Sequence, residues 1–149
     1  MIVYCIQKRK YSNWPPQGAL FAEGRWNKPG QWIIYTSGSV SLAKLEVLAN
    51  SKILPRNMIV HKIELSSKST MRFVEKEQLS NDWMNVHYLE ELQNITDSFL
   101  RKTGELVLRV PSAQSVTEYN YLINPGHRKF DSWVSLISTS EEPFDHRLK

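Results

Sequence analysis

Short segments in which apolar and polar residues alternate restrict the fold of this chain more than any other feature of its sequence. In residues 58–65, apolar side chains such as Ile59 and Ile63 fall on one face, and Lys62 and Glu64 fall on the other. This period of two is typical of a strand with one buried face. Further segments predict strands by alternation, or by a short apolar run beside a turn signal. They are residues 1–6, 32–36, 105–110, 119–123 and 133–138.

Helical patterns are few. Residues 82–102 carry apolar side chains spaced by three and four, and Gly104 follows where a helix would end. A shorter helix is expected after Ser39 or Ser41, since either serine can cap its first turn. The sequence therefore predicts a single compact α+β domain over residues 1–149, with a mixed or mainly antiparallel sheet and a few helices. The apolar positions of the long helix are Val86, Leu89, Leu92, Ile95 and Phe99.

Charge, hydropathy and cysteine content narrow the class of protein. The formal net charge is +4, but the basic residues are scattered and not interleaved with aromatic residues, so we expect no direct binding to nucleic acid. A mildly positive surface suits an anionic small molecule or an acidic protein partner. No segment reaches about 20 apolar residues, the length of a membrane span, and one cysteine fits a reducing compartment, so we expect a cytoplasmic protein. The histidines and Cys5 lack metal-ligand spacing, which predicts no metal site.

Arg25 lies between Gly24 and Trp26, ahead of the strand predicted at residues 32–36. Glycine allows a ligand to approach the backbone closely, and an indole ring offers a surface on which a guanidinium or a base can stack. The planar guanidinium suits two hydrogen bonds to phosphate oxygens, such as those of a dinucleotide pyrophosphate. The alternative is an arginine that pairs with a carboxylate at a sheet edge. We interpret Asn27 as a turn residue.

Glu46 falls in the apolar stretch of the shorter predicted helix. At about 100° per residue it lies between Leu42 and Ala43 on the helix surface. A carboxylate in these surroundings needs a partner or a function, because an isolated buried charge is costly. It either forms an ion pair, for example with Arg25, or lies in a cleft where it stabilises a developing oxocarbenium ion. We expect the buried face of the helix to consist of Leu42, Leu45, Leu48 and Ala49, with Ala43 and Val47 beside it.

Ser112 follows Pro111 at the end of the strand predicted at residues 105–110. Proline restrains the backbone at this exit, and loops at strand ends often carry functional groups. The serine has no Gly-x-Ser-x-Gly elbow, and the histidines carry no local triad signature, so the sequence does not indicate an acyl-transfer nucleophile. We interpret Ser112 as a hydrogen-bond partner of a ligand, or as a serine that closes a turn.

Seven motifs, in the proper order along the chain, resemble the landmarks of the RES domain family, which is named for Arg, Glu and Ser. The resemblance implies a fold similar to ADP-ribosyltransferase toxins. It also implies a bacterial type II toxin that cleaves NAD at the nicotinamide N-glycosidic bond, with NAD as substrate and no resident cofactor. The implied partner is an antitoxin with an Xre-like helix-turn-helix. The motifs are residues 4–6, 23–27, 34–37, 42–48, 110–112, 120–125 with His127, and 143–145 with Arg147 and Leu148.

The resemblance also implies roles for the three residues considered above. Arg25 would bind or orient the dinucleotide, Glu46 would stabilise the ribosyl cation, and Ser112 would hydrogen-bond the substrate. We expect a NAD glycohydrolase, but water, phosphate or a protein nucleophile could each accept the ADP-ribosyl group. The alternatives are an ADP-ribosyltransferase that modifies a protein, and a non-catalytic interaction or nucleic-acid-binding domain in which the three residues are structural.

Further positions carry expectations of their own. By the same resemblance, Tyr35 would line the nicotinamide side and Asn120 would brace the site or cap a turn, and Trp26 is the stacking surface described above. Two residues depart from the family pattern. Cys5 stands where relatives commonly have an arginine, which could remove a phosphate contact, and Thr96 stands where a helix glycine is common, which we expect to affect packing more than chemistry.

Overall fold

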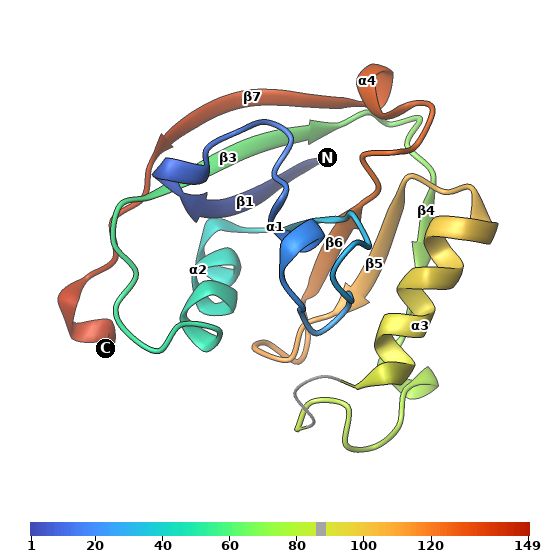
Figure 1. The fold of residues 1–149 in the computed structure, drawn as a ribbon, viewed down its shortest axis with the longest axis horizontal. Helices are drawn as coiled ribbons and strands as arrows, with labels where there is room; N and C mark the ends of the chain where they lie inside the picture. Colours follow the sequence, from blue (N-terminus) through green and yellow to red (C-terminus); the bar gives the residue numbers. More distant parts are fainter. Residues whose placement is uncertain (86–88) are drawn as a thin grey trace.

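One sheet of seven strands organises the described part of the chain, residues 1–85 and 89–149 of this computed structural model (Figure 1). The strand order is β4-β5-β6-β2-β1-β3-β7, and neighbouring strands are antiparallel except β4 and β5, which run parallel. The predicted α+β class with a mixed, mainly antiparallel sheet is confirmed. The strands are β1 (Ile2–Lys8), β2 (Ile34–Ser37), β3 (Met58–Leu65), β4 (Met71–Phe73), β5 (Val107–Pro111), β6 (Tyr119–Ile123) and β7 (Val134–Glu141).

Four α-helices lie outside the sheet in the same described residues, and α3 continues directly into a π-helix (Figure 1). The α-helices are α1 (Gly18–Phe21), α2 (Val40–Ala49), α3 (Glu90–Ser98) and α4 (Phe130–Trp133). The π-helix spans Phe99–Thr103, and short 3₁₀ turns occupy Arg9–Tyr11, Lys76–Gln78 and His146–Leu148. Among the described residues, no helix combines the length and the apolar character needed to cross a membrane.

Each predicted strand is present, and the differences lie at the ends. The ranges 58–65 and 119–123 agree with β3 and β6, whereas β7 continues to Glu141. The sequence analysis missed β4, because three residues are too few to show an alternating pattern. Its backbone pairs with β5, more than thirty residues later in the chain, so the pairing that defines β4 leaves no local signal.

The long helix predicted at residues 82–102 is wrong in its first part. Residues 82–85 form a turn, in which the Asn85 N–H donates to the Asp82 carbonyl oxygen at 2.9 Å, and α3 begins only at Glu90. The predicted position Val86 lies outside the described residues. The remainder is confirmed, since Leu92 and Phe99 are buried, and Gly104 ends the helical segment with a left-handed φ of 75°.

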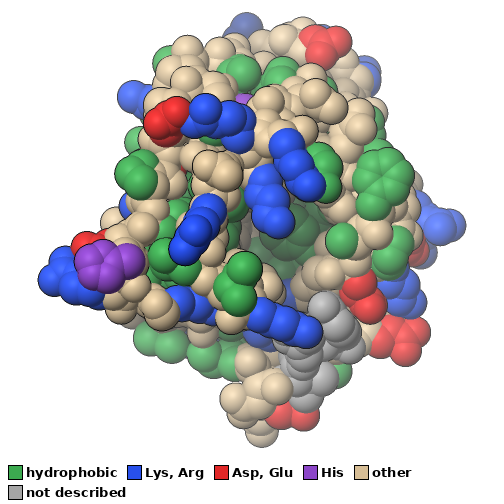
Figure 2. All heavy atoms as spheres, turned by 60° about the vertical axis from the view of Figure 1, so that its left-hand side comes forward, with side chains coloured by type: hydrophobic (Ala, Val, Ile, Leu, Met, Phe, Trp, Pro, Cys, Tyr) green, Lys and Arg blue, Asp and Glu red, His purple; other side chains and the backbone are tan. Residues whose placement is uncertain are grey.

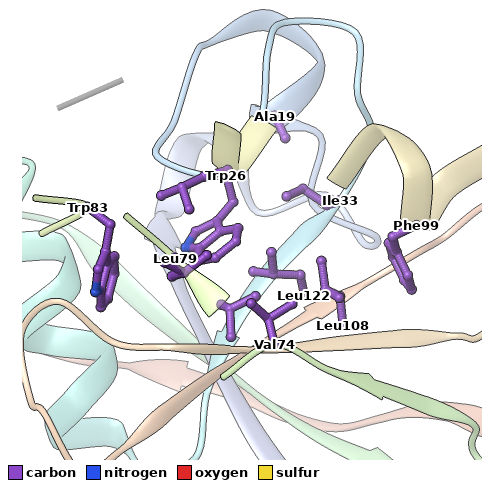
Figure 3. Packing of buried hydrophobic residues seen from close by; sticks show 11 residues of the cluster. Ala19, Trp26, Ile33, Val74, Leu79, Trp83, Phe99, Leu108 and Leu122 are labelled. Carbon is purple, nitrogen blue, oxygen red and sulfur yellow. The ribbon is translucent and has the colours of Figure 1, made fainter. Parts of the chain in front are cut away.

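Two hydrophobic clusters cover the two faces of the sheet. Leu108 of β5 faces the first cluster, which lies between the sheet and α3, and the neighbouring Val107 faces the second (Figure 3). The second cluster also holds Ile63 of β3, four strands away in the sheet order, so the sheet must curve around it. Cys5 belongs to this cluster, and its burial raises the pKa of the thiol to about 12. Thr96 of α3 is fully buried, and its hydroxyl contacts no hydrogen-bond partner among the described residues.

The sheet is loosest between β1 and β2, which pair only at Tyr4 and Ser37. Directly after β2 the chain turns into α2, which packs against β1 and β2. Ser39 rather than Ser41 caps this helix, because the Leu42 N–H donates to the Ser39 hydroxyl oxygen at 3.1 Å. The candidate site lies beside this single β1–β2 pairing, next to α2.

Candidate functional site

Glu46 lies on α2, which is apolar on nearly every side, so its composition does not show which side is buried. The structure buries Leu42 and Ala43, while Leu45 is 46% exposed and Ala49 is exposed. The predicted buried arc that included Leu45 and Ala49 is therefore wrong, because the helix turns its other side toward β1 and β2. Glu46 follows the buried side, one turn after Leu42 and Ala43, and is half-buried.

Two neutral side chains hold the Glu46 carboxylate. The Ser112 hydroxyl donates to Oε1 at 2.8 Å, and the Asn120 amide Nδ2 donates to the same oxygen at 2.6 Å. The other oxygen, Oε2, accepts no hydrogen bond from the residues that the structure describes. One oxygen is thus held in place and the other keeps its hydrogen-bonding capacity.

A further ring of contacts orients the two donors. The Ser37 hydroxyl donates to Asn120 Oδ1 at 2.7 Å, which turns the amide nitrogen toward Glu46. Ser112 Oγ accepts the backbone N–H groups of Gln114 at 3.0 Å and Ser115 at 3.3 Å, so its proton is directed to the carboxylate. Ser112 is 1% exposed. This geometry favours a positioning role for Ser112 over the direct substrate contact that the sequence suggested.

Arg25 sits in a tight turn that buried amides hold in shape. The Gly24 N–H donates to the Asn27 carbonyl oxygen at 3.0 Å, and Gln93 Nε2 of α3 donates to the carbonyl oxygens of Gly24 at 3.3 Å and Asn27 at 3.2 Å. A Cβ atom on Gly24 would lie 2.6 Å from both Asn27 Oδ1 and Tyr35 Oη. Glycine is required at this position by close contact, and Asn27 is a buried turn residue, as predicted.

Tyr35 connects this turn to β2. Its hydroxyl donates to Asn27 Oδ1 at 2.6 Å and accepts the Trp26 backbone N–H at 3.2 Å. The tyrosine therefore fixes the two residues that follow Arg25, and it also lines the cavity described below.

The guanidinium of Arg25 is anchored by the segment before α3. Its Nη1 donates to the Trp83 carbonyl oxygen at 2.7 Å, and its Cζ lies 5.8 Å from the centre of the Trp83 ring. Burial lowers the pKa of Arg25, and the negative charge of Glu46 partly offsets this effect. The two charges therefore interact, but the hydrogen bonds that orient Glu46 come from Ser112 and Asn120.

Trp26 does not provide the ring beside Arg25 that the sequence led us to expect. Its side chain is 2% exposed and belongs to the first hydrophobic cluster, packed near Val74 and Leu79 (Figure 3). The ring over which the guanidinium lies is that of Trp83. Trp26 forms a buried part of the cavity wall.

A cavity of about 470 Å³ brings most of the predicted site residues together. This volume lies within the range of small-molecule sites. Ser112 is absent from the wall and lies behind Glu46. Figure 2 shows Lys and Arg side chains gathered around a hollow on the face that carries α2. The wall includes Arg25, Trp26, Tyr35, Glu46 and Asn120, together with Glu23 and Ser37.

Four residues that contribute to the site were missed by the sequence analysis: Ser37, Trp83, Gln93 and Glu23. Ser37 reaches Asn120 because β2 and β6 place them directly opposite each other, a pairing across 83 positions of sequence. Trp83 reaches the Arg25 turn from the segment before α3, and Gln93 reaches it from α3 itself, so both approach across more than fifty positions of sequence. Glu23 had a local signal, since it directly precedes the Gly24-Arg25 motif.

Comparisons with known proteins identify the family and the fold of this chain. A family model described as the RES domain matches residues 2–146. A protein named Toxin Res from Yersinia enterocolitica is 33% identical over the full length of both chains. Another Toxin Res, from Photorhabdus laumondii, is 28% identical over 99% of this chain and 97% of the relative. A chain in the crystal structure of the M. tuberculosis MbcT-MbcA toxin-antitoxin complex superposes with a TM-score of 0.71 at 15% identity, covering 95% of this chain and 84% of that one, which shows a shared fold.

Proposed function

This chain belongs to the RES domain family, and on that premise we propose that it is a bacterial toxin that cleaves NAD at the bond between nicotinamide and ribose. NAD is the substrate in this proposal, and no resident cofactor is required. Relatives named Toxin Res, similar over the full chain, support the toxin assignment. The observation that carries the enzymatic assignment is the Glu46 carboxylate, held through one oxygen on the wall of a cavity that also contains Arg25.

Glu46 has the properties that cleavage of this bond needs. When nicotinamide departs, positive charge develops on the ribose, and a carboxylate already held in position stabilises that charge without reorganising. The hydrogen bonds to Oε1 come from a hydroxyl and an amide, neither of which neutralises the carboxylate as a directly paired cation would. The negative charge is therefore directed at whatever occupies the cavity.

Arg25 supplies the complementary contact. Its guanidinium lines the same cavity and is anchored by the Trp83 carbonyl oxygen and ring. A guanidinium suits phosphate oxygens because it is always charged and presents several N–H groups in one plane. We assign Arg25 to the pyrophosphate, Tyr35 to the nicotinamide side, Asn120 to the support of Glu46 and Trp26 to the cavity wall.

Water is the proposed acceptor of the ADP-ribosyl group. The oxocarbenium ion is attacked at the ribose carbon by a water oxygen, the water proton leaves to solvent, and ADP-ribose and nicotinamide are released. Phosphate or a protein nucleophile would attack the same carbon, so a phosphorolytic enzyme or a protein-modifying ADP-ribosyltransferase would use the same site. The acceptor is therefore a question for product analysis.

An antitoxin is the proposed protein partner. The structural neighbour comes from a toxin-antitoxin complex, and the RES resemblance implies an antitoxin with an Xre-like helix-turn-helix. We propose that both act in the cytoplasm, where NAD is available. Co-purification of this chain with the product of a neighbouring antitoxin gene, and loss of toxicity when the two are co-expressed, are the expected results.

Glu46→Gln tests the enzymatic proposal. The substitution keeps the shape of the side chain and removes its charge, so nicotinamide release from NAD should be abolished while the thermal unfolding midpoint changes little. Glu77→Gln is the matched control, because Glu77 is an exposed carboxylate that is absent from the cavity wall. It should leave turnover unchanged.

Chromatography of the products identifies the acceptor. ADP-ribose indicates hydrolysis, phosphorylated ADP-ribose in phosphate buffer indicates phosphorolysis, and label retained on a protein indicates transfer. Undiminished nicotinamide release by Glu46→Gln would refute the role of Glu46, and binding of DNA by the chain without any NAD turnover would favour the non-catalytic alternative.

A further inference from the structure

Glu23 is a second carboxylate at the candidate site, and the proposed reaction does not yet use it. It lines the main cavity and also a smaller cavity of about 280 Å³ between β1, α1 and β2. Ile6, Gly24 and Tyr35 are likewise shared by the two walls. Glu23 therefore stands where the two cavities meet.

A buried side chain holds Glu23 in place. Gln93 Nε2 donates to Glu23 Oε2 at 2.7 Å, and Gln93 is itself 2% exposed. The same amide nitrogen holds the Gly24 and Asn27 carbonyl oxygens, so Glu23 is tied to the Arg25 turn. An exposed carboxylate would otherwise sample many rotamers, and this contact restricts it to the junction of the cavities.

Glu23 has no direct cationic partner in the part of the chain that the structure describes. Its carboxylate accepts a hydrogen bond from the neutral amide of Gln93, and among the described residues no lysine or arginine forms an ion pair with it. The carboxylate whose charge acts on the pKa of Arg25 is that of Glu46. Among the described residues that line the main cavity, the carboxylates of Glu23 and Glu46 thus accompany one guanidinium, that of Arg25.

The smaller cavity has the chemistry of a site for a flat, positively charged ring. Its wall is mainly apolar, with Ala19, Cys5 and Ile33 among its residues, which suits the faces of a heteroaromatic ring. The Glu23 carboxylate in its wall favours a ring that carries positive charge. In NAD the nicotinamide ring is a pyridinium cation in the oxidised form and neutral in the reduced form, although the two forms are otherwise nearly the same size.

We propose that Glu23 is a substrate-selecting residue that favours the positively charged nicotinamide ring of oxidised NAD over the neutral ring of NADH. This inference rests on the proposed function, since it concerns how the same substrate is recognised. Glu23 acts on binding: the positive charge leaves the ring when the glycosidic bond breaks, so the carboxylate stabilises the bound substrate and contributes nothing to the departing neutral nicotinamide.

Equilibrium binding of both nucleotides tests the proposal. Titrations of oxidised NAD and NADH use the Glu46→Gln variant as a common background, so that NAD is not consumed, and they compare it with the same variant carrying Glu23→Gln or Glu77→Gln. Glu23→Gln should weaken binding of oxidised NAD by about two- to five-fold, the range of an exposed pair of opposite charges, and leave NADH binding unchanged. The control Glu77→Gln should change neither.

Turnover by proteins that retain Glu46 separates this proposal from the proposed function. Glu23→Gln should raise KM for NAD by a similar factor without lowering kcat. If Glu23→Gln weakens both nucleotides equally, or neither, or if Glu77→Gln has the same effect, the role of Glu23 is wrong while NAD cleavage stands. If neither nucleotide binds and nicotinamide is not released, both proposals are wrong.

Discussion

The Glu46 cluster (Glu46, Ser112 and Asn120) and the His61 cluster (His61, Gln7 and Thr139) are both sets of hydrogen-bonded polar side chains at this sheet, but only the first leaves an oxygen without a donor among the described residues. His61 of β3 is 1% exposed, and each of its ring nitrogens has a partner at 2.7 Å, Gln7 at Nε2 and Thr139 at Nδ1. The ring also packs against Trp14, with centroids 5.6 Å apart. Glu46, in contrast, has one oxygen held and the other without a donor among the described residues, beside a cavity.

This difference separates a structural polar group from a functional one. Burial of a polar side chain is costly in either place, and complete hydrogen bonding offsets that cost at His61. At Glu46 the hydrogen bonds orient the group without using its full capacity. Oε2, which accepts no hydrogen bond from the described residues, lies on a side chain that lines a cavity of ligand size, and this combination indicates a catalytic role. Substitutions in the Glu46 cluster should therefore lower NAD turnover, whereas substitutions in the His61 cluster should lower the free energy of unfolding.

Of the changes that compare the two clusters, Ser112→Ala should have the largest effect, which is a fall in NAD turnover. It removes one of the two donors to Glu46 Oε1 and leaves the cavity wall unchanged, since Ser112 is not part of it. We expect kcat for nicotinamide release to fall about 10- to 100-fold, which corresponds to the roughly 1.5–3 kcal/mol of a hydrogen bond to a charged group. Initial rates with NAD provide the measurement.

Ser115→Ala is the matched control for this loop. Its hydroxyl donates to Glu118, away from Glu46, and its backbone N–H to Ser112 is retained. Turnover by this variant should stay close to that of the unaltered protein. Equal losses in the two variants would show that the loop, rather than the Ser112 hydroxyl, supports the site.

His61→Leu should have a smaller effect, and on stability alone. The substitution removes the two hydrogen bonds of the buried ring, to half-buried Gln7 and exposed Thr139, so the free energy of unfolding should fall by about 1–3 kcal/mol. Denaturant unfolding measures the change, and NAD turnover per folded molecule should be unaltered. A marked fall in kcat would break the distinction between the clusters, because it would couple His61 to the cavity.

The smallest expected effect is a change in the free energy of unfolding with pH, which arises from the titration of His61. Gln7 Nε2 can only donate, so His61 Nε2 accepts and Nδ1 carries the proton that is donated to Thr139, which is the neutral ring. Burial lowers the pKa of His61 below its ordinary value of 6.5. The neutral form is therefore favoured in the folded state, and its contribution to stability is complete above pH 6.5 and is lost as the pH falls through the lower folded-state pKa.

Comparing the unaltered protein with His61→Leu separates the titration of His61 from that of the carboxylates, because both proteins carry the same carboxylates. The stability advantage of the unaltered protein over His61→Leu should shrink as the pH falls below 6.5, the ordinary pKa of the imidazole. Parallel curves for the two proteins between neutral and mildly acidic pH would contradict the assignment of a buried neutral ring.

Local sequence patterns were sufficient for what depends on neighbours along the chain. The alternation in residues 58–65 predicted β3 with its observed ends, and the left-handed Gly104 ended the helical segment as expected. The near-uniform apolar character of α2 left its buried side undetermined, so Leu45 was placed inward although tertiary packing turns it outward. The turn at residues 82–85 replaced helix where α3 was expected to begin.

In the candidate site, too, only the features with a local sequence signal could be predicted. Glu46 could be singled out because a charge on an apolar helix is a local anomaly. Its partners could not be derived, because Ser112 and Asn120 reach it across 66 and 74 positions of sequence through the pairing of strands. The stacking partner of Arg25 was misassigned to Trp26 for this reason, since Trp83 approaches from a separate segment.

The distance in sequence between Glu46 and its two donors has a consequence for the synthesis of the chain. A ribosome releases Glu46 and the cap of α2 long before Ser112 and Asn120 exist, so the carboxylate has neither donor until the last quarter of the chain is emerging. For a protein whose proposed activity would harm the cell that makes it, an antitoxin is thus not needed before Asn120 has been synthesised.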